Sequence, residues 1–150
     1  MEMKLNLAGK LRNTKLARSK ALLPLFEAIV NSFHSIEEIQ GRGKIIIRAT
    51  RCKSLEGILT PAIESFEIID NGIGFTQDNY DSFITSDSLY KIKKGGKGLG
   101  RFLWLKAFQE VHLTCFFAAS NDSGMPMLKR TFSFDPTSAV KGGIEEPIEG

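Results

Sequence analysis

The sequence predicts a single α+β domain, built as a two-layer sandwich of a mainly antiparallel sheet with helices on one face. Three observations lead to this class. The chain has 150 residues, close to the commonest size for one domain. A hydrophobic fraction of 42% with 25% charged residues excludes a disordered chain, a collagen-like repeat and a coiled-coil rod. Segments of helical periodicity alternate with short segments rich in β-branched and aromatic residues.

The predicted domain organisation has three parts. Residues 1–20 are expected to be an N-terminal lead-in, and residues 21–135 the folded domain. Residues 136–150 combine glycines and acidic residues with few apolar ones, which predicts a flexible tail. Neither an internal repeat nor a low-complexity linker divides the chain.

Two helices are predicted from apolar periodicity. The first covers residues 22–39, with Pro24 in its first turn and glycines beyond its end. Its apolar residues fall in one sector that should border the core, and they include Phe26, Ile29, Val30 and Phe33. The second helix covers residues 99–109, where Phe102, Trp104 and neighbouring apolar residues should be core.

Four strands are predicted from β-branched and aromatic segments. Residues 44–52 and 65–69 are joined by a connection too short for a crossover helix, so they should pair antiparallel. Residues 111–119 and 127–134 flank a turn at 121–124. The polar stretch from residue 76 to residue 94 has weak periodicity, and no element is predicted there.

Charge and cysteine content narrow the class of protein. The net charge is +3, and basic residues cluster in residues 1–20 and 91–106, which suits phosphates of a nucleotide or nucleic acid, or a solvated basic face. Cys52 and Cys115 have no metal-ligand spacing and are expected to be reduced thiols of a cytoplasmic protein. The basic and polar residues at positions 1–20 argue against a secretory signal, and no apolar run in the sequence is long enough to predict a membrane span.

The first of three candidate functional motifs lies on the helix at residues 22–39. Glu27, Asn31 and His34 share one stripe of this helix, because residues four and seven apart lie on the same face. A carboxylate and a carboxamide one turn apart at the edge of buried surface are poorly explained by packing. An ordinary boundary face of a helix is the alternative interpretation.

The second motif follows the strand at residues 65–69. Asp70 ends this strand and is followed by Gly72 and Gly74, so one carboxylate reaches the rim of the sheet where backbone can pass close to a ligand. An aspartate there can accept a hydrogen bond from an amino group such as that of adenine. A plain turn is the alternative, since Asp-Asn-Gly is a common turn sequence.

The third motif is a glycine-rich run that leads into the second predicted helix. Backbone N–H groups and the helix dipole can receive phosphate at such a place. The run lacks the lysine and hydroxyl pattern of a Walker A loop, and a flexible loop is the alternative. Its candidate binding residues are Gly95, Gly96, Lys97, Gly98, Leu99 and Gly100.

Together the three motifs resemble those of the GHKL superfamily, which includes the gyrase B subunit, ninety-kilodalton heat-shock chaperones, histidine kinases and MutL proteins. Glu27 and Asn31 match its E-x-x-x-N box. Asp70, Gly72 and Gly74 match its D-x-G-x-G box, and the run at 95–100 matches G-x-x-G-x-G. The resemblance covers residues 20–110 in order and implies a Bergerat-type ATP-binding fold.

The resemblance implies roles for these residues. Glu27 would orient and deprotonate the attacking water, and Asn31 would ligate Mg²⁺ at the phosphates. Asp70 would accept a hydrogen bond from adenine, the glycines would let backbone pass the nucleotide, and residues 76–94 would form a lid over ATP. The implied activity is a Mg²⁺-dependent ATPase at the N-terminal part of a longer, ATP-gated protein. Its implied partners are downstream domains, a nucleotide-dependent homodimer in the full-length protein, and a client protein or nucleic acid.

The sequence also departs from the family pattern. His34 stands where MutL-like proteins carry an acid, and no G-T or G-S box followed by a strand comes after residue 110. We therefore expect the ATP-binding domain to be truncated at its C-terminal end and slow or inactive alone. Two alternatives stay open, namely a histidine-kinase-type phosphotransferase domain and a non-hydrolysing, nucleotide-gated or nucleic-acid-binding module.

Overall fold

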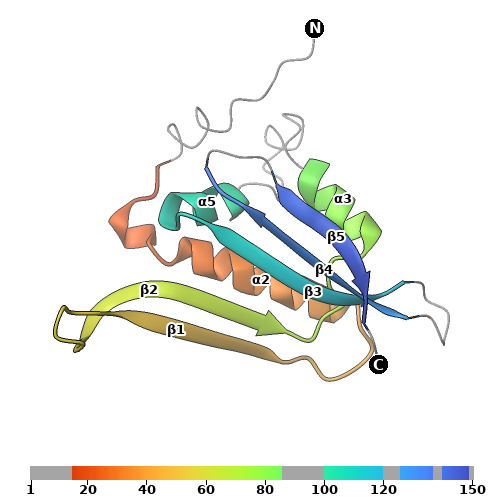
Figure 1. Cartoon of the computed structure of the whole chain (residues 1–150), viewed down its shortest axis with the longest axis horizontal. Helices are drawn as coiled ribbons and strands as arrows, with labels where there is room; N and C mark the ends of the chain where they lie inside the picture. Colours follow the sequence, from red (N-terminus) through yellow and green to blue (C-terminus); the bar gives the residue numbers. More distant parts are fainter. Residues whose placement is uncertain (1–14, 86–99, 120–125, 137–139, 149–150) are drawn as a thin grey trace, which may run out of the picture. The chain divides into compact units, whose positions relative to one another are not determined.

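The computed structural model describes residues 15–85, 100–119, 126–136 and 140–148 of the chain. These residues form an α+β structure in which helices accompany antiparallel sheets (Figure 1). The chain divides into two compact units: unit 2 is the continuous stretch Leu25–Gly72, and unit 1 comprises Met1–Pro24 and Ile73–Gly150. Within the described ranges, no helix is both long and apolar enough to cross a lipid bilayer.

Unit 2 consists of one long helix and one β-hairpin. Helix α2 spans Leu23–Glu37, strand β1 spans Ile45–Lys53 and strand β2 spans Leu59–Asp70. The two strands are antiparallel, with Ile45 opposite Asp70, as the short connection predicts. Strand β2 starts earlier than the predicted residue 65, and the pairing register shifts on both sides of Arg51. These irregularities accommodate Pro61 inside the strand, because proline cannot donate a hydrogen bond to a regular ladder.

Unit 1 contains a second antiparallel sheet with the strand order β3-β4-β5. The chain enters this unit through a short 3₁₀ helix, Arg18–Lys20, which precedes α2. Its other elements are α3 (Gln77–Thr85), α5 (Gly100–Ala107), β3 (Val111–Ala118), β4 (Met127–Phe134) and β5 (Lys141–Pro147). The sequence predicts one sheet, whereas the described residues form two, so that prediction is wrong.

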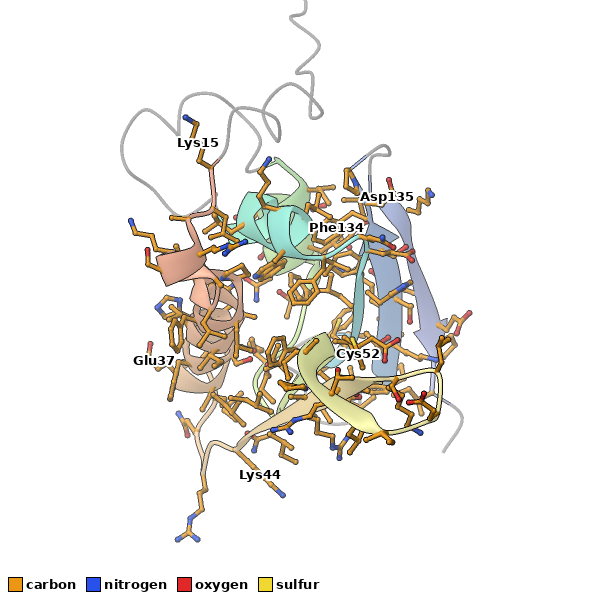
Figure 2. The ribbon with its side chains drawn as sticks, turned by 90° about the vertical axis from the view of Figure 1, so that its left-hand side faces the viewer. Lys15, Glu37, Lys44, Cys52, Phe134 and Asp135 are labelled. Atoms are coloured by element: carbon orange, nitrogen blue, oxygen red, sulfur yellow. The ribbon has the colours of Figure 1, made fainter. Side chains whose placement is uncertain are left out.

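The core of unit 1 lies on one face of strand β4. Phe132 and Phe134, two residues apart on the strand, both lie on that face and are 1% and 4% exposed. Phe83 of α3 packs edge-on against Phe132, with ring centroids 5.6 Å apart. Trp104 of α5 stacks on Phe134, which is labelled in Figure 2, with ring centroids 6.2 Å apart. The Trp104 indole N–H donates to the Pro24 carbonyl at 2.9 Å. Both helices therefore cover the same face of β4, and the prediction that Trp104 is core is confirmed.

Helix α3 occupies part of the stretch for which the sequence predicts no element. Thr76 starts it, since the Thr76 carbonyl accepts from the Tyr80 N–H at 2.8 Å and its hydroxyl accepts from the Asn79 N–H at 3.3 Å. Tyr80 and Phe83 both pack on Phe132. A cap and two aromatic contacts thus stabilise a helix that apolar periodicity does not reveal. The rest of the expected lid, residues 86–94, lies outside the described residues.

Strand β5 lies in the segment that the sequence predicts to be a flexible tail. It pairs with β4 from Ser133 opposite Lys141 to Leu128 opposite Pro147. Gly142 and Gly143 have φ values of +89° and +91° at a register shift in this ladder, a conformation that favours glycine. The prediction of a tail is therefore wrong for Lys141–Pro147, and the glycine pair serves as a bulge.

Candidate functional site

Helix α2 presents its small residues, not its large apolar ones, to the rest of unit 2. Ser32 is 5% exposed, whereas Phe26, Val30 and Phe33 are 54%, 45% and 55% exposed. The sequence predicts that this apolar sector borders the core, which is wrong for these three residues, while Ile29 of the same sector is half-buried. The reason is the closeness of α2 to the end of β2: a Cβ atom built on Gly72 would lie 2.6 Å from the backbone carbonyl carbon of Ser35.

Asp70 is held at the rim of the hairpin by two hydrogen bonds. The Ser32 hydroxyl donates to Oδ2 at 2.7 Å, and the Gly72 backbone N–H donates to Oδ1 at 2.9 Å. An ionised carboxylate offers about four acceptor positions, so each oxygen can still accept another bond. The residue remains exposed. Asp70 is thus an oriented acceptor that solvent, or a ligand with an amino group, can reach.

Asn71 fastens the segment between α2 and β1 to this rim. Its side-chain oxygen accepts from the Lys44 N–H at 2.7 Å, and its amide nitrogen donates to the Arg42 carbonyl at 3.0 Å. Its backbone N–H also donates to the Lys44 carbonyl, at 3.3 Å. Asn71 therefore holds the chain before β1 at this rim, while Asp70 keeps its own bonds to Ser32 and Gly72.

Glu27 and Asn31 lie on the same helix as Ser32, one turn apart. Glu27 and His34 are half-buried and Asn31 is exposed, so all three occupy an edge between the buried and exposed faces of α2. Their role in a site stays a prediction. The structure brings this helix and Asp70 together within unit 2 through the Ser32–Asp70 bond.

The remaining motif residues belong to unit 1 or lie outside the described residues. Gly74 has a φ of +76°, and a Cβ atom there would lie 2.7 Å from the Phe116 carbonyl oxygen, so a glycine is required. Gly100 is the first residue of α5, as the prediction of a glycine run leading into a helix requires. Five predicted binding residues, Gly95, Gly96, Lys97, Gly98 and Leu99, lie outside the described residues.

Sequence reasoning missed two residues of this site, Ser32 and Ser35. Both lie on the small-residue face of α2, where Ser32 bonds Asp70 and Ser35 meets Gly72. The available signal was the pattern of small residues at Ala28, Ser32 and Ser35, spaced four and three apart. Such spacing indicates a face that backbone can approach closely.

In the described part of the chain, no three histidine, cysteine, aspartate or glutamate side chains gather in a group that could hold a metal. Mg²⁺ in nucleotide sites is commonly bound by one or two protein oxygens together with phosphates and water. Glu27 and Asn31 supply oxygens of that kind from one helix face. Cys52 and Cys115 are not joined in a disulfide.

Comparison with protein-family models found no match to this chain, and comparisons with curated proteins and with solved structures found none either. Function is therefore inferred from the side chains and backbone of this chain.

Proposed function

We propose that the chain is an ATP-binding module of GHKL type with Mg²⁺-dependent ATPase activity. One observation carries the proposal: the Asp70 carboxylate is oriented by Ser32 and Gly72 at 2.7 and 2.9 Å, yet stays exposed. The Gly72 bond is the local turn that an Asp-Asn-Gly sequence commonly forms, whereas the Ser32 bond comes from helix α2 and holds the carboxylate from a second element. A carboxylate with unused acceptor positions suits the exocyclic amino group of adenine.

Helix α2 supplies the groups for the phosphate end. In the proposed complex Asn31 holds Mg²⁺ with the phosphates, and Glu27 orients water as a general base. The bound ion would supply neutralisation of phosphate charge. Gly72 and Gly74 match the D-x-G-x-G box, although local structure already requires both: Gly72 by the close approach of Ser35 and Gly74 by its positive φ. We also propose that this module acts together with downstream domains and a partner subunit, and that it regulates a client protein or nucleic acid.

Affinity of Asp70→Asn for ATP tests the base-binding role. Asparagine can keep both internal bonds, because its oxygen can accept from Gly72 and its amide can donate to the Ser32 hydroxyl, which then acts as acceptor. The variant should therefore fold normally but lose the outward-facing charge. A hydrogen bond to a charged group is worth about 1.5–3 kcal/mol, so Kd should rise about ten- to a hundredfold.

Calorimetric titration with Mg-ATP measures this, with Glu64→Gln as the control. Glu64 is an exposed acid on the same strand β2, so its loss changes net charge equally without touching the rim. Equal affinities of Asp70→Asn and the parent would show that ATP is not held at Asp70.

Turnover by Glu27→Ala tests the catalytic role separately. Loss of a general base costs about 10²–10⁴ in rate, whereas ATP affinity should hardly change. Glu37→Ala, an exposed acid at the end of the same helix, is the matched control and should turn over like the parent. Normal turnover by Glu27→Ala would leave a kinase-type or non-hydrolysing module as the better interpretation.

A further inference from the structure

A buried arginine lies at the centre of unit 1. Arg130 of β4 is fully buried, and burying a charge is costly unless it is paired and hydrogen-bonded. One guanidinium nitrogen, Nη1, donates to the Phe75 and Thr76 carbonyls at 2.8 and 3.1 Å. The other, Nη2, donates to the side-chain oxygen of Gln77 at 2.7 Å and forms an ion pair with Glu145 of β5.

Two aromatic rings fix the position of this guanidinium. Its central carbon lies 4.5 Å from the ring centroid of Tyr80 and 4.7 Å from that of Phe117. Such cation–π contacts favour the planar guanidinium of arginine over the ammonium of lysine. Nε is buried with no hydrogen-bond partner among the described residues. All of the hydrogen bonds described for Arg130 are therefore donated by its two terminal nitrogens, Nη1 and Nη2.

Three of the hydrogen-bond acceptors of Arg130 belong to consecutive residues. Phe75, Thr76 and Gln77 follow directly on Gly74, the last glycine of the D-x-G-x-G motif, and Gln77 is the first residue of α3. Gly74 itself is confined by the Phe116 carbonyl, and its own carbonyl accepts from Asn79 at 3.3 Å. The backbone that leaves the motif is therefore fixed from β4, β3 and α3 at once.

We propose that Arg130 is a positioning residue for the nucleotide site, and that Glu145 of β5 controls it. This proposal rests on the proposed ATP-binding function. Arg130 holds the segment Phe75–Gln77 in the conformation that the motif needs, and Glu145 balances its charge. The Glu145 side chain is 37% exposed, so the carboxylate can be neutralised without emptying a core position. Without the Glu145 charge, Arg130 is a buried cation with no ionic partner, and its guanidinium would bind water or other acceptors instead.

Glu145→Gln is the decisive variant, and Glu146→Gln is its control. Glu146 is the next residue on β5, is exposed and pairs in register with Lys129, so its side chain lies on the opposite face of the sheet. Amide hydrogen exchange is measured first, without nucleotide. The amides of Gln77–Phe83 should exchange faster in Glu145→Gln and at the parent rate in Glu146→Gln. Equal exchange in all three proteins overturns the proposal.

ATP binding and turnover then separate positioning from general destabilisation. Glu145→Gln should raise the Kd for Mg-ATP about fivefold or more, the lower end of coupling between distant groups, with kcat at saturating ATP unchanged. Leu105 is a buried residue of α5, and Leu105→Val removes one buried methylene. This lowers stability without changing Arg130 or the residues that it contacts. It should bind ATP like the parent. An equal loss of affinity in Leu105→Val and Glu145→Gln would show that only stability matters, and overturns the proposal.

The two proposals fail in different ways. If the parent itself does not bind ATP, the proposed function fails and the nucleotide role of Arg130 fails with it. If the parent binds ATP and Glu145→Gln binds it equally well, only the control by Glu145 is overturned. The exchange measurement distinguishes these results, because it reports on the backbone at Gln77–Phe83 in the absence of nucleotide.

Discussion

Ser35 fills the space beside Gly72 that a side chain would need. A Cβ atom built on Gly72 would lie 2.6 Å from the Ser35 carbonyl carbon and would also overlap its side chain. Because the backbone of Ser35 is involved, no change of rotamer relieves the overlap. The first glycine of the D-x-G-x-G motif is therefore required by packing of helix α2, independently of any ligand.

Gly72→Ala should lower the free energy of unfolding by about 1–3 kcal/mol, the usual cost of overpacking. Urea denaturation measures this on the nucleotide-free protein. Gly57→Ala is the comparison, since nothing lies within 4 Å of a Cβ there and only its φ of +80° is strained. An unfolding free energy of Gly72→Ala within about 0.5 kcal/mol of the parent would contradict the close approach.

Ser32→Ala should weaken ATP binding although Ser32 is too buried to bind the ligand itself. The variant removes the hydroxyl that orients Asp70 from 2.7 Å, at a cost of about 0.5–1.5 kcal/mol in stability. Ser65→Ala, at an exposed position of β2, is the control for loss of a serine. Titration calorimetry of both variants decides the matter: if Ser32→Ala binds ATP as tightly as Ser65→Ala, orientation of Asp70 is unimportant.

Helix α2 should tolerate polar residues on its apolar sector better than large residues on its small face. Phe33→Gln should cost less than about 1 kcal/mol, because the side chain is 55% exposed. Ser32→Leu should cost about 1–3 kcal/mol, since Ser32 is 5% exposed and close to Asp70. The reverse order of stabilities in urea would mean that the apolar sector is the packed face, as periodicity alone suggests.

Trp104→Phe should destabilise unit 1 by about 1–3 kcal/mol. It keeps an aromatic ring against Phe134 but removes the indole N–H that donates to the Pro24 carbonyl at 2.9 Å, and the smaller ring fills a buried site less completely. Thermal unfolding followed by circular dichroism measures the change, because Trp104 is the only tryptophan and its loss removes the fluorescence signal. An unchanged melting temperature would show that this bond contributes nothing.

The elements with strong local patterns could be predicted from sequence, and those stabilised by distant residues could not. Helix α2, the β1–β2 hairpin and the β3–β4 pair carry clear periodicity or β-branched segments. Strand β5 has no such pattern. Its structure depends on pairing with β4 and on the ion pair of Glu145 with Arg130, which the local sequence does not reveal. Helix α3 likewise depends on its Thr76 cap and on contacts with Phe132.

The candidate site could be predicted in part for the same reason. Spacing alone identifies Glu27 and Asn31 as neighbours, and the strand end identifies Asp70. Spacing cannot tell which face of α2 packs inward, because that choice depends on how closely the helix must approach Gly72. The apolar sector, including Phe26, therefore looked like the core, although the small-residue face with Ser32 is the buried one.

The bond between Trp104 and the Pro24 carbonyl bears on the order in which the two units can form during synthesis. Its partners are 80 residues apart, and the whole of Leu25–Gly72 lies between them. Unit 2 has all of its residues once Gly72 leaves the ribosome, and its Ser32–Asp70 bond closes a loop of 38 residues. Closing the longer loop costs more chain entropy, and it must wait for α5 to be translated. We therefore expect α2 and the β1–β2 hairpin to fold during translation, before the bond between Trp104 and the Pro24 carbonyl can form.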